Sequence, residues 1–301
     1  MPEPRHVVVS GASGLIGRAL VTSLRSDGVR VTTLVRRPAQ SADEVPWLQD
    51  AEPLDPAALE GADAVVSLSG ASVGRFPWTR SYKSTLLWSR LTPTRTLARA
   101  LRALGSDAPA FVSASAVGFY GSAPGVAQDE SSGPGNGFLS RLTVEWEQAA
   151  REAGDNTRIA LLRTAPVVHQ QGVLKPLILL TKLGLSGPIG RGTQAWPWIS
   201  LADEVGAIRH ILAEQITGPV NLTGPTHATA NDLGFALARR MNRPYVLRAP
   251  AWAVRMALGT DATEALLTND VLLSPTVLTS TGYRFTHPTV EDAVAAAVPA
   301  A

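Results

Sequence analysis

A glycine-rich loop near the amino end constrains the fold of this chain more than any other feature. The loop, Ser10–Gly17, reads SGASGLIG and lies between a short apolar run and an amphipathic helical pattern. In a loop with this G-x-x-G-x-x-G spacing, Gly11 permits the tight turn and Gly14 lets backbone N–H groups approach a pyrophosphate. Gly17 lets the helix pack closely on the strand, and the helix N-terminus then faces the phosphate charge. The loop therefore predicts a dinucleotide site, and a turn that is merely rich in glycine is the alternative.

The segments that follow the loop alternate between apolar runs and helical patterns. Strands are predicted at His6–Ser10, Val29–Val35, Ala62–Leu68, Ala110–Ser115 and Ile159–Leu162, with a weaker strand within Trp47–Leu54, and helices at Leu15–Ser26, Tyr82–Leu104 and Leu139–Ala153. Strands that are apolar throughout are buried on both faces, which is typical of a parallel sheet with helices on both sides. The sequence therefore predicts an α/β fold with a doubly wound parallel sheet.

This alternation breaks down after about residue 165. Glycine and proline cluster in Gly184–Trp198, and helical patterns follow at Ala202–Ala213, at Asn231–Met241 and beyond Pro250. We expect a dinucleotide-binding domain over residues 1–165 and a smaller lobe over residues 166–301. Whether later segments return to the sheet is left open.

The end of the second predicted strand indicates which dinucleotide fits. Loops that prefer NAD carry Asp or Glu there to bind the ribose 2′-OH, whereas this chain has Arg36 and Arg37 and no acid before Asp43. Two guanidinium groups suit a 2′-phosphate, which a carboxylate would repel. We therefore expect NADP(H) as the cofactor, and a solvated arginine pair is the alternative. After the Ala62–Leu68 strand, Leu68–Gly70 either passes beneath the nicotinamide ribose or forms an ordinary turn.

The composition argues against several other classes of protein. With no Cys there is no disulfide, no thiolate nucleophile and no Cys-based metal site, and the five His residues show no metal-ligand spacing. The 27 basic residues balance 25 acidic ones and form no run with interleaved aromatics, so nucleic acid is not an expected partner. No apolar run is long enough to span a membrane, and the six residues before the first apolar run are too few for a signal peptide. We expect a cytoplasmic protein without a metal or membrane partner.

Several longer stretches carry a family resemblance. The SGASGLIG loop is similar to the TGATGFIG loop of extended, epimerase/dehydratase-like short-chain dehydrogenases/reductases. The further stretches are Ser113–Gly121, Phe138-Leu139 with Trp146-Glu147, Leu162–Thr164, and Leu183–Gly190 running on to Trp198-Ile199 and Asp203. Together they resemble an atypical "epimerase family" branch, and the sequence from about Tyr245 resembles that branch's small helical domain of unknown function.

The resemblance implies a Rossmann-type cofactor domain and a C-terminal substrate lobe, with the active site between them. It also implies that Arg90 reaches the cofactor phosphates. The residues expected at the cofactor are Gly11, Ser13, Gly14, Leu15, Ile16, Gly17, Arg36, Arg37, Leu68, Ser69, Gly70, Arg90 and Thr164.

The superfamily's usual catalytic pair, Tyr-x-x-x-Lys, is missing from this chain. In that pair the Lys lowers the pKa of the Tyr, so that the phenol exchanges a proton during hydride transfer. None of the four tyrosines has a Lys four residues later, and the expected position reads Phe138–Leu142. Ser115 falls on the superfamily's serine and Tyr120 follows it, so both are candidate catalytic residues. For Tyr120 a packing aromatic is the alternative.

Two positions in the second lobe also bear on the chemistry. Ser200 stands where related proteins commonly have a His, which puts proton chemistry inherited at that position in doubt. Asp203 is expected to cap or open the helix that follows it.

The sequence predicts an NADP(H)-binding oxidoreductase that transfers hydride to or from an unknown small carbonyl, hydroxyl or imine compound. The alternative is a catalytically silent sensor or scaffold, because the cofactor loop is present and the Tyr/Lys pair is not. A homodimer through the Tyr82–Leu104 helix is one option, and packing of its apolar face on its own sheet is the other.

Overall fold

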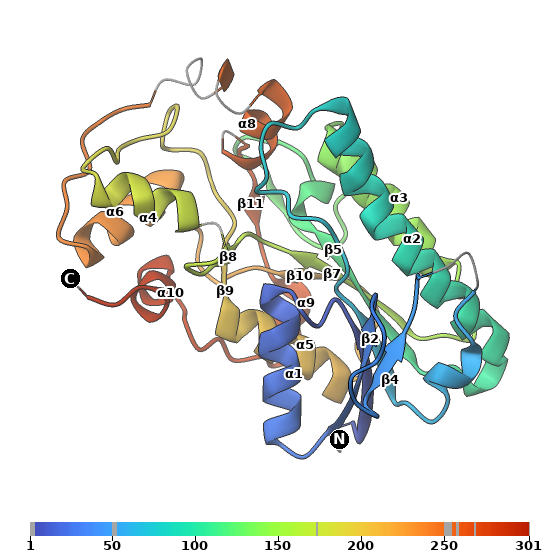
Figure 1. The fold of residues 1–301 in the computed structure, drawn as a ribbon. Helices are drawn as coiled ribbons and strands as arrows, with labels where there is room; N and C mark the ends of the chain where they lie inside the picture. The colour runs from blue at the N-terminus through green and yellow to red at the C-terminus, as the bar shows by residue number, and fades with distance from the viewer. Residues whose placement is uncertain are drawn as a thin grey trace.

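A seven-stranded parallel sheet forms the centre of the computed structural model, which describes residues 4–49, 53–172, 174–249, 255–256, 259–267 and 269–300 (Figure 1). The sheet contains β1 (His6–Ser10), β2 (Arg30–Val35), β3 (Glu44–Pro46), β4 (Ala64–Ser67), β5 (Ala110–Ala116), β7 (Ile159–Thr164) and β10 (Gly218–Leu222). The strand order is β10-β7-β5-β4-β1-β2-β3, and every neighbouring pair is parallel.

Helices cover both faces of this sheet. They are α1 (Leu15–Ser26) and α5 (Leu201–Ala213) on one face, and α2 (Arg80–Leu104) and α3 (Phe138–Arg151) on the other. Along β1, Val7 and Val9 join the core beneath α1 and α5, whereas Val8 joins the core beneath α2. Successive side chains of a strand point to opposite faces, so a strand that is apolar throughout has both faces buried. The predicted doubly wound α/β fold is confirmed.

The third strand was predicted in the wrong place. It is β3, which pairs with β2 through Thr33 and Glu44, and not a segment within Trp47–Leu54. Leu48 has a positive φ of 52°, which ends extended backbone directly after the strand. Trp47 is buried in the core beneath the sheet, so the apolar character of this stretch reflects packing and not strand pairing.

Segments beyond residue 165 return to the sheet. The strand β10 forms one edge of the sheet beside β7, and α5 packs against α1. No strand was predicted at β10, because Gly218 and Pro219 are uncommon within strands and interrupt its apolar pattern. The domain boundary near residue 165 stays a prediction.

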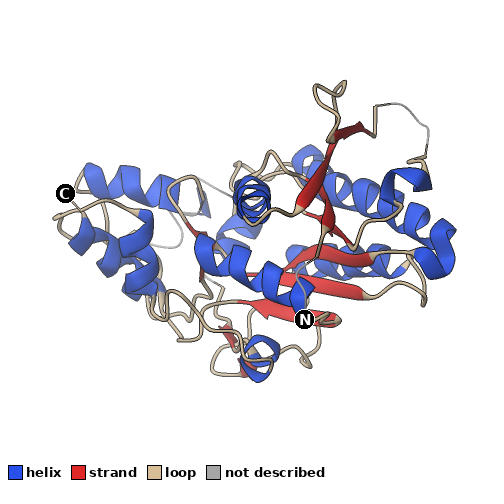
Figure 2. Ribbon diagram, turned by 90° about the horizontal axis from the view of Figure 1, so that it is seen from below, coloured by secondary structure: helices blue, strands red, loops and turns tan. Residues whose placement is uncertain are grey.

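A smaller lobe lies beyond the carboxyl ends of the strands (Figure 2). It contains α4 (Leu174–Lys182), α6 (Ala230–Arg240) and α10 (Val290–Ala297), which share a buried core with Trp196 and Trp198. Two short ribbons connect it to the main domain: β8 (Val167–Val168) pairs with β9 (Ile199–Ser200), and β6 (Ala127–Gln128) pairs with β11 (Leu272–Leu273). Two further helices are α8 (Thr260–Leu266) and α9 (Thr276–Ser280). Among the described residues no helix combines the length and apolarity needed to cross a bilayer.

Candidate cofactor and active site

The glycine loop joins β1 to α1 with no space for side chains at two positions. Gly11 has a φ of +74°, and a Cβ there would lie 2.6 Å from the backbone of Leu68; a Cβ on Gly17 would lie 2.3 Å from the carbonyl oxygen of Gly11. The positive φ and close packing at Gly11 fit the tight turn predicted there, and the contact at Gly17 fits the predicted close packing of the helix on the strand.

The N-terminus of α1 is open toward this loop. Its N-cap residue, Gly14, makes no side-chain capping hydrogen bond, and the first turn carries no acid. Ser13 and Gly14 are exposed. Arg18, which the sequence analysis did not single out, lies beside the loop and donates to the carbonyl oxygen of Ser13 at 3.0 Å. Uncapped N–H groups and a nearby guanidinium form an anion-binding arrangement.

The turn after β4 lies against this loop. Ser69 donates to the Oγ of Ser10 at 3.1 Å, and Ser10 donates to Ser67 at 3.3 Å. These hydroxyls join the carboxyl ends of β1 and β4, and Leu68 contacts the place where Gly11 lacks a side chain. The structure thus brings Leu68 and Ser69 to the glycine loop, as a cofactor-binding turn requires.

Arg90 lies beneath the same turn. Its guanidinium donates to the carbonyl oxygens of Leu86 (2.9 Å) and Ala71 (3.1 Å) and stacks 5.1 Å from the ring of Trp146. Burial lowers the pKa of Arg90 to about 10. Gly70 leaves room for it, because a Cβ there would lie 3.2 Å from the guanidinium carbon. These contacts fix Arg90 beside the turn, and its contact with a phosphate stays a prediction.

The two arginines after β2 have different surroundings. Arg37 donates to both carboxylate oxygens of Glu44, at 2.8 and 2.7 Å, and these hydrogen bonds lower the pKa of Glu44 to about 2. Arg36 is exposed and has no side-chain hydrogen bond or ion pair in the described part of the chain. Of the two, Arg36 is the guanidinium available to a ligand.

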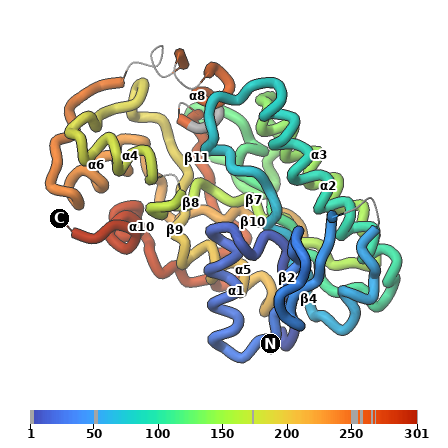
Figure 3. Tube along the Cα trace, in the orientation of Figure 1, coloured from blue at the N-terminus to red at the C-terminus, as the bar shows by residue number. Residues whose placement is uncertain are grey.

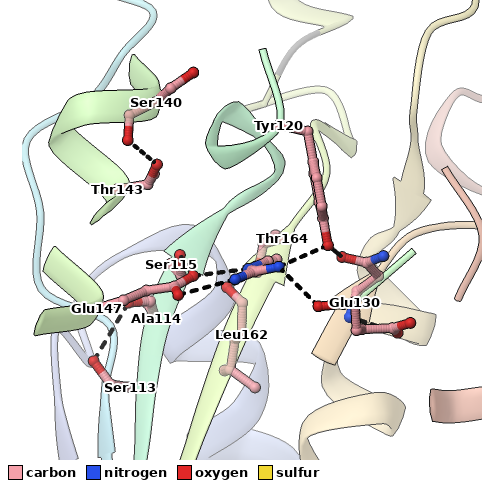
Figure 4. Close-up of polar contacts among 12 residues, drawn as sticks. Ser113, Ala114, Ser115, Tyr120, Glu130, Ser140, Thr143, Glu147, Leu162 and Thr164 are labelled. Atoms are coloured by element: carbon pink, nitrogen blue, oxygen red, sulfur yellow. Dashed lines mark hydrogen bonds and ion pairs between the residues drawn. The ribbon is translucent and has the colours of Figure 1, made fainter. Parts of the chain in front are cut away.

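Ser115 and Tyr120 belong to one buried polar network (Figure 4). Ser115 donates to Oε1 of Glu147 at 2.8 Å, and Arg163 donates from Nε and Nη2 to the two oxygens of the same carboxylate at 2.8 and 3.1 Å. Arg163 also donates to the Oη of Tyr120 at 2.9 Å, and Tyr120 donates to Oδ1 of Asn221 at 2.6 Å. The network joins β5, β7, β10 and α3.

These contacts determine what the two hydroxyl groups can do. Both hydroxyl protons are donated to internal acceptors, Glu147 and Asn221. Burial raises the pKa of Tyr120, which moves the phenol further from the range of a proton carrier at neutral pH. The structure thus brings Ser115 and Tyr120 together in one network of internal hydrogen bonds. Their catalytic role stays a prediction.

Apolar packing replaces the Tyr/Lys pair at the start of α3. Phe138 packs edge-on against Trp78 with ring centroids 5.9 Å apart, and Leu142 is buried in the same cluster. Ser140, between them, donates to the carbonyl oxygen of Gly118 at 2.9 Å. The carbonyl oxygen of Ser140 accepts from the hydroxyl of Thr143 at 2.9 Å (Figure 4).

Glu204 is a buried carboxyl group that sequence analysis missed. It is fully buried on α5, and Thr164, the last residue of β7, donates to its Oε1 at 2.9 Å. Its Oε2 has no hydrogen-bond partner among the residues that the structure describes. Burial raises the pKa of Glu204 to about 8, so the group is neutral at pH 7. In the sequence Glu204 looks like an ordinary acid in the first turn of a helix, and only the fold reveals its burial.

The cap of α5 is Ser200, and Asp203 lies in the first turn, so of the two expected roles Asp203 opens the helix and does not cap it. Ser200 accepts from the backbone N–H of Asp203 at 3.0 Å and donates to its Oδ2 at 2.7 Å. Asp203 also accepts from the backbone N–H groups of Thr286 (2.6 Å) and His287 (3.1 Å). It therefore anchors the segment before α10 to the main domain.

Residues 7–222 match the model of the NAD dependent epimerase/dehydratase family, and residues 249–297 match a domain of unknown function, DUF1731. The chain belongs to the NAD-dependent epimerase/dehydratase family. The resemblance inferred from the sequence motifs is confirmed.

The relatives match over nearly their whole length. An epimerase family protein of Mycobacterium leprae is 40% identical over 293 residues, covering 96% of this chain and 94% of the relative. The human epimerase family protein SDR39U1 is 32% identical over 292 residues, covering 94% and 96%. A crystal structure of human SDR39U1 (isoform 2) with NADPH has a TM-score of 0.87 at 29% identity and covers 97% of this chain and 98% of that chain.

The buried Glu147–Arg163 pair predicts a large loss of stability when it is broken. Glu147→Ala leaves the guanidinium of Arg163 buried without its carboxylate, which costs about 3–5 kcal/mol of unfolding free energy. Glu152→Ala is the matched control, because Glu152 caps the C-terminus of the same helix and pairs with Arg95 at the surface, where about 0–1 kcal/mol is expected. Urea denaturation measures both, and equal losses would contradict the account.

The burial of Glu204 predicts that the stability difference between Glu204→Gln and wild type depends on pH. The pKa is raised from 4.5 to about 8 on folding, so the folded state binds this proton more tightly than the unfolded state. The cost of burying the charge is absent below pH 4.5, grows as the pH rises toward 8, and is constant above that. Glu204→Gln removes the ionisation, so its Tm relative to wild type should increase between about pH 5 and pH 9.

The exposed Glu214 at the end of α5 provides the control. Glu214→Gln should leave the Tm difference independent of pH. If the Tm of Glu204→Gln differs from the Tm of wild type by the same amount at every pH, Glu204 is not buried and neutral.

Proposed function

We propose that this protein binds NADP(H) at the glycine loop and transfers hydride between the nicotinamide and a small carbonyl or hydroxyl compound. The close backbone packing at Gly11 and Gly17, beside an uncapped α1 N-terminus, is the observation that carries the proposal. Membership of the epimerase/dehydratase family and the NADPH in the structure of human SDR39U1 support it.

The residues around the loop fit such a cofactor in distinct ways. Backbone N–H groups of the α1 N-terminus would hold the pyrophosphate. Arg36 would bind the ribose 2′-phosphate because its guanidinium has no partner within the described ranges. Leu68 and Ser69 would lie beneath the nicotinamide ribose. The bound cofactor would supply the hydride chemistry.

The proton must be handled differently from the usual superfamily scheme. Phe138 and Leu142 occupy the place of the Tyr/Lys pair, and the hydroxyl protons of Ser115 and Tyr120 are donated internally. We propose that Ser115 and Tyr120 shape the substrate side of the site and that water exchanges the proton. The substrate lobe over residues 166–301, the cytoplasmic location and a homodimer through α2 stay parts of this proposal.

The second candidate is a sensor or scaffold that binds NADP(H) without turnover. The internal hydrogen bonds of both candidate hydroxyls favour it. A panel of small carbonyl compounds with NADPH separates the two functions. NADPH oxidation above background, lowered by Ser115→Ala, would support the enzyme. NADPH binding without NADPH oxidation across the panel would support the sensor.

Arg36 predicts the preference for NADPH over NADH. Arg36→Gln removes a charge-assisted contact to the 2′-phosphate, so NADPH affinity should fall by about 1.5–3 kcal/mol, roughly ten- to a hundredfold. NADH affinity should change little, because NADH has only a hydroxyl group there. Fluorescence titration of both nucleotides measures the change.

Arg37→Gln is the matched control, because Arg37 is already held by Glu44. Its effect on NADPH affinity should be the smaller of the two. If Arg37→Gln weakens NADPH binding more than Arg36→Gln does, the assignment of the 2′-phosphate to Arg36 is wrong.

A further inference from the structure

Large hydrophobic side chains are exposed together on the smaller lobe. Of the ten that are exposed in the described part of the chain, seven lie there, with exposed fractions between 40% and 70%. We call these seven the apolar patch: Leu179, Leu180, Leu183, Leu185, Phe235, Val246 and Leu247. Exposed apolar surface that gathers in this way marks an interaction site more often than a chance arrangement.

Backbone and ring contacts bring together the segments that carry the patch. The N–H groups of Val246 and Leu247 both donate to the carbonyl oxygen of Ser186, at 3.0 and 3.1 Å, which places them beside Leu185. Leu185 in turn donates from its backbone to the carbonyl oxygen of Leu180 at 2.9 Å.

The other end of the patch reaches α6. The ring of Phe235 lies 4.5 Å from the ring of Tyr245, the residue before Val246. Helices α4 and α6 lie side by side in the lobe, as the tube view also shows (Figure 3). The patch residues therefore come from three segments that lie next to one another in the lobe.

The segments that carry the patch are strongly basic. Residues 174–191 and 230–249 contain seven basic residues and one acidic residue, a formal charge of +6, whereas the whole chain carries +2. The basic residues are Lys175, Lys182, Arg191, Arg239, Arg240, Arg243 and Arg248, and the acid is Asp232. Arg191 pairs with Asp270 and Arg240 binds backbone carbonyls, while Lys182, Arg239, Arg243 and Arg248 are exposed.

We propose that this face of the smaller lobe docks on an anionic lipid surface. The leucine side chains enter the boundary between headgroups and acyl chains, and the surrounding lysine and arginine side chains bind lipid phosphates. Long basic side chains suit this position because their stems lie along apolar surface while their charges stay in water. The aromatic pair Phe235–Tyr245 adds an amphipathic edge of the kind found at membrane interfaces.

A second copy of this chain is a poorer fit to the patch. Two such faces would bring like charges together around their apolar centres, which opposes association. The inference departs from the sequence-based expectation of no membrane partner, which rested on the lack of a spanning run. Docking needs no spanning run, and the exposed residues are too scattered along the chain to form one.

Vesicle co-sedimentation tests the proposal. Wild type should bind vesicles that contain a quarter phosphatidylglycerol in phosphatidylcholine, and should bind pure phosphatidylcholine vesicles much more weakly. High salt should release it, because screening weakens the attraction to the lipid phosphates. The double variant Leu183→Glu with Leu247→Glu should lower the partition coefficient by about tenfold or more, and Arg239→Glu with Arg243→Glu should act in the same direction.

Trp88→Glu is the matched control, because Trp88 is 52% exposed on α2, outside the patch. It should bind vesicles like wild type. The Tm of every variant should match that of wild type, which shows that the variants fold without relying on the proposed NADPH binding.

Equal vesicle binding by wild type and Leu183→Glu/Leu247→Glu would overturn the proposal, as would no preference of wild type for anionic vesicles. A stoichiometric complex with an acidic protein, without vesicle binding, would assign the patch to a protein partner and overturn the lipid assignment.

Discussion

The close approach of backbone to backbone at the β1–α1 junction is the constraint on which the rest of the site depends. Gly11 packs on the turn after β4, and Gly17 packs on Gly11 itself. This packing sets the direction of α1 and leaves its N-terminus uncapped at the carboxyl edge of the sheet. In a parallel sheet that edge is where ligands bind, because the loops of neighbouring strands converge there. The turn after β4 and Arg36, which follows β2, lie at this same edge because β4 and β2 are the two neighbours of β1 in the sheet.

A second interaction fixes the far side of the proposed site. The buried Glu147–Arg163 pair joins α3 to β7, and through Ser115 and Tyr120 it extends to β5 and β10. A buried ion pair of this kind is weak evidence for stability, since its desolvation cost is high. The network nevertheless favours one arrangement of these elements, because the side chains of Glu147, Arg163, Ser115 and Tyr120 each have a specific partner. The hydroxyl groups of Ser115 and Tyr120, the two candidates for chemistry, thus take part in hydrogen bonds within the scaffold.

What the sequence could predict depended on whether the signal was local. The glycine loop, the apolar strands and the absence of Tyr-x-x-x-Lys are patterns within a few residues, and from them the fold class was predicted correctly. The contacts of Ser115 with Glu147 and of Thr164 with Glu204 join residues 32 and 40 positions apart, and no local pattern marks them. The edge strand β10 and the position of β3 depended on pairing partners and not on hydrophobicity. The apolar patch is assembled from three segments, none of which looks unusual alone.

Calorimetric titration of the wild-type protein with NADPH and with NADH tests the central claim most directly. The account predicts one NADPH bound per chain, tighter than NADH, and loss of that binding when Gly17→Val places a side chain against the carbonyl of Gly11. No uptake of NADPH, or equal NADPH binding by wild type and a folded Gly17→Val variant, would contradict it.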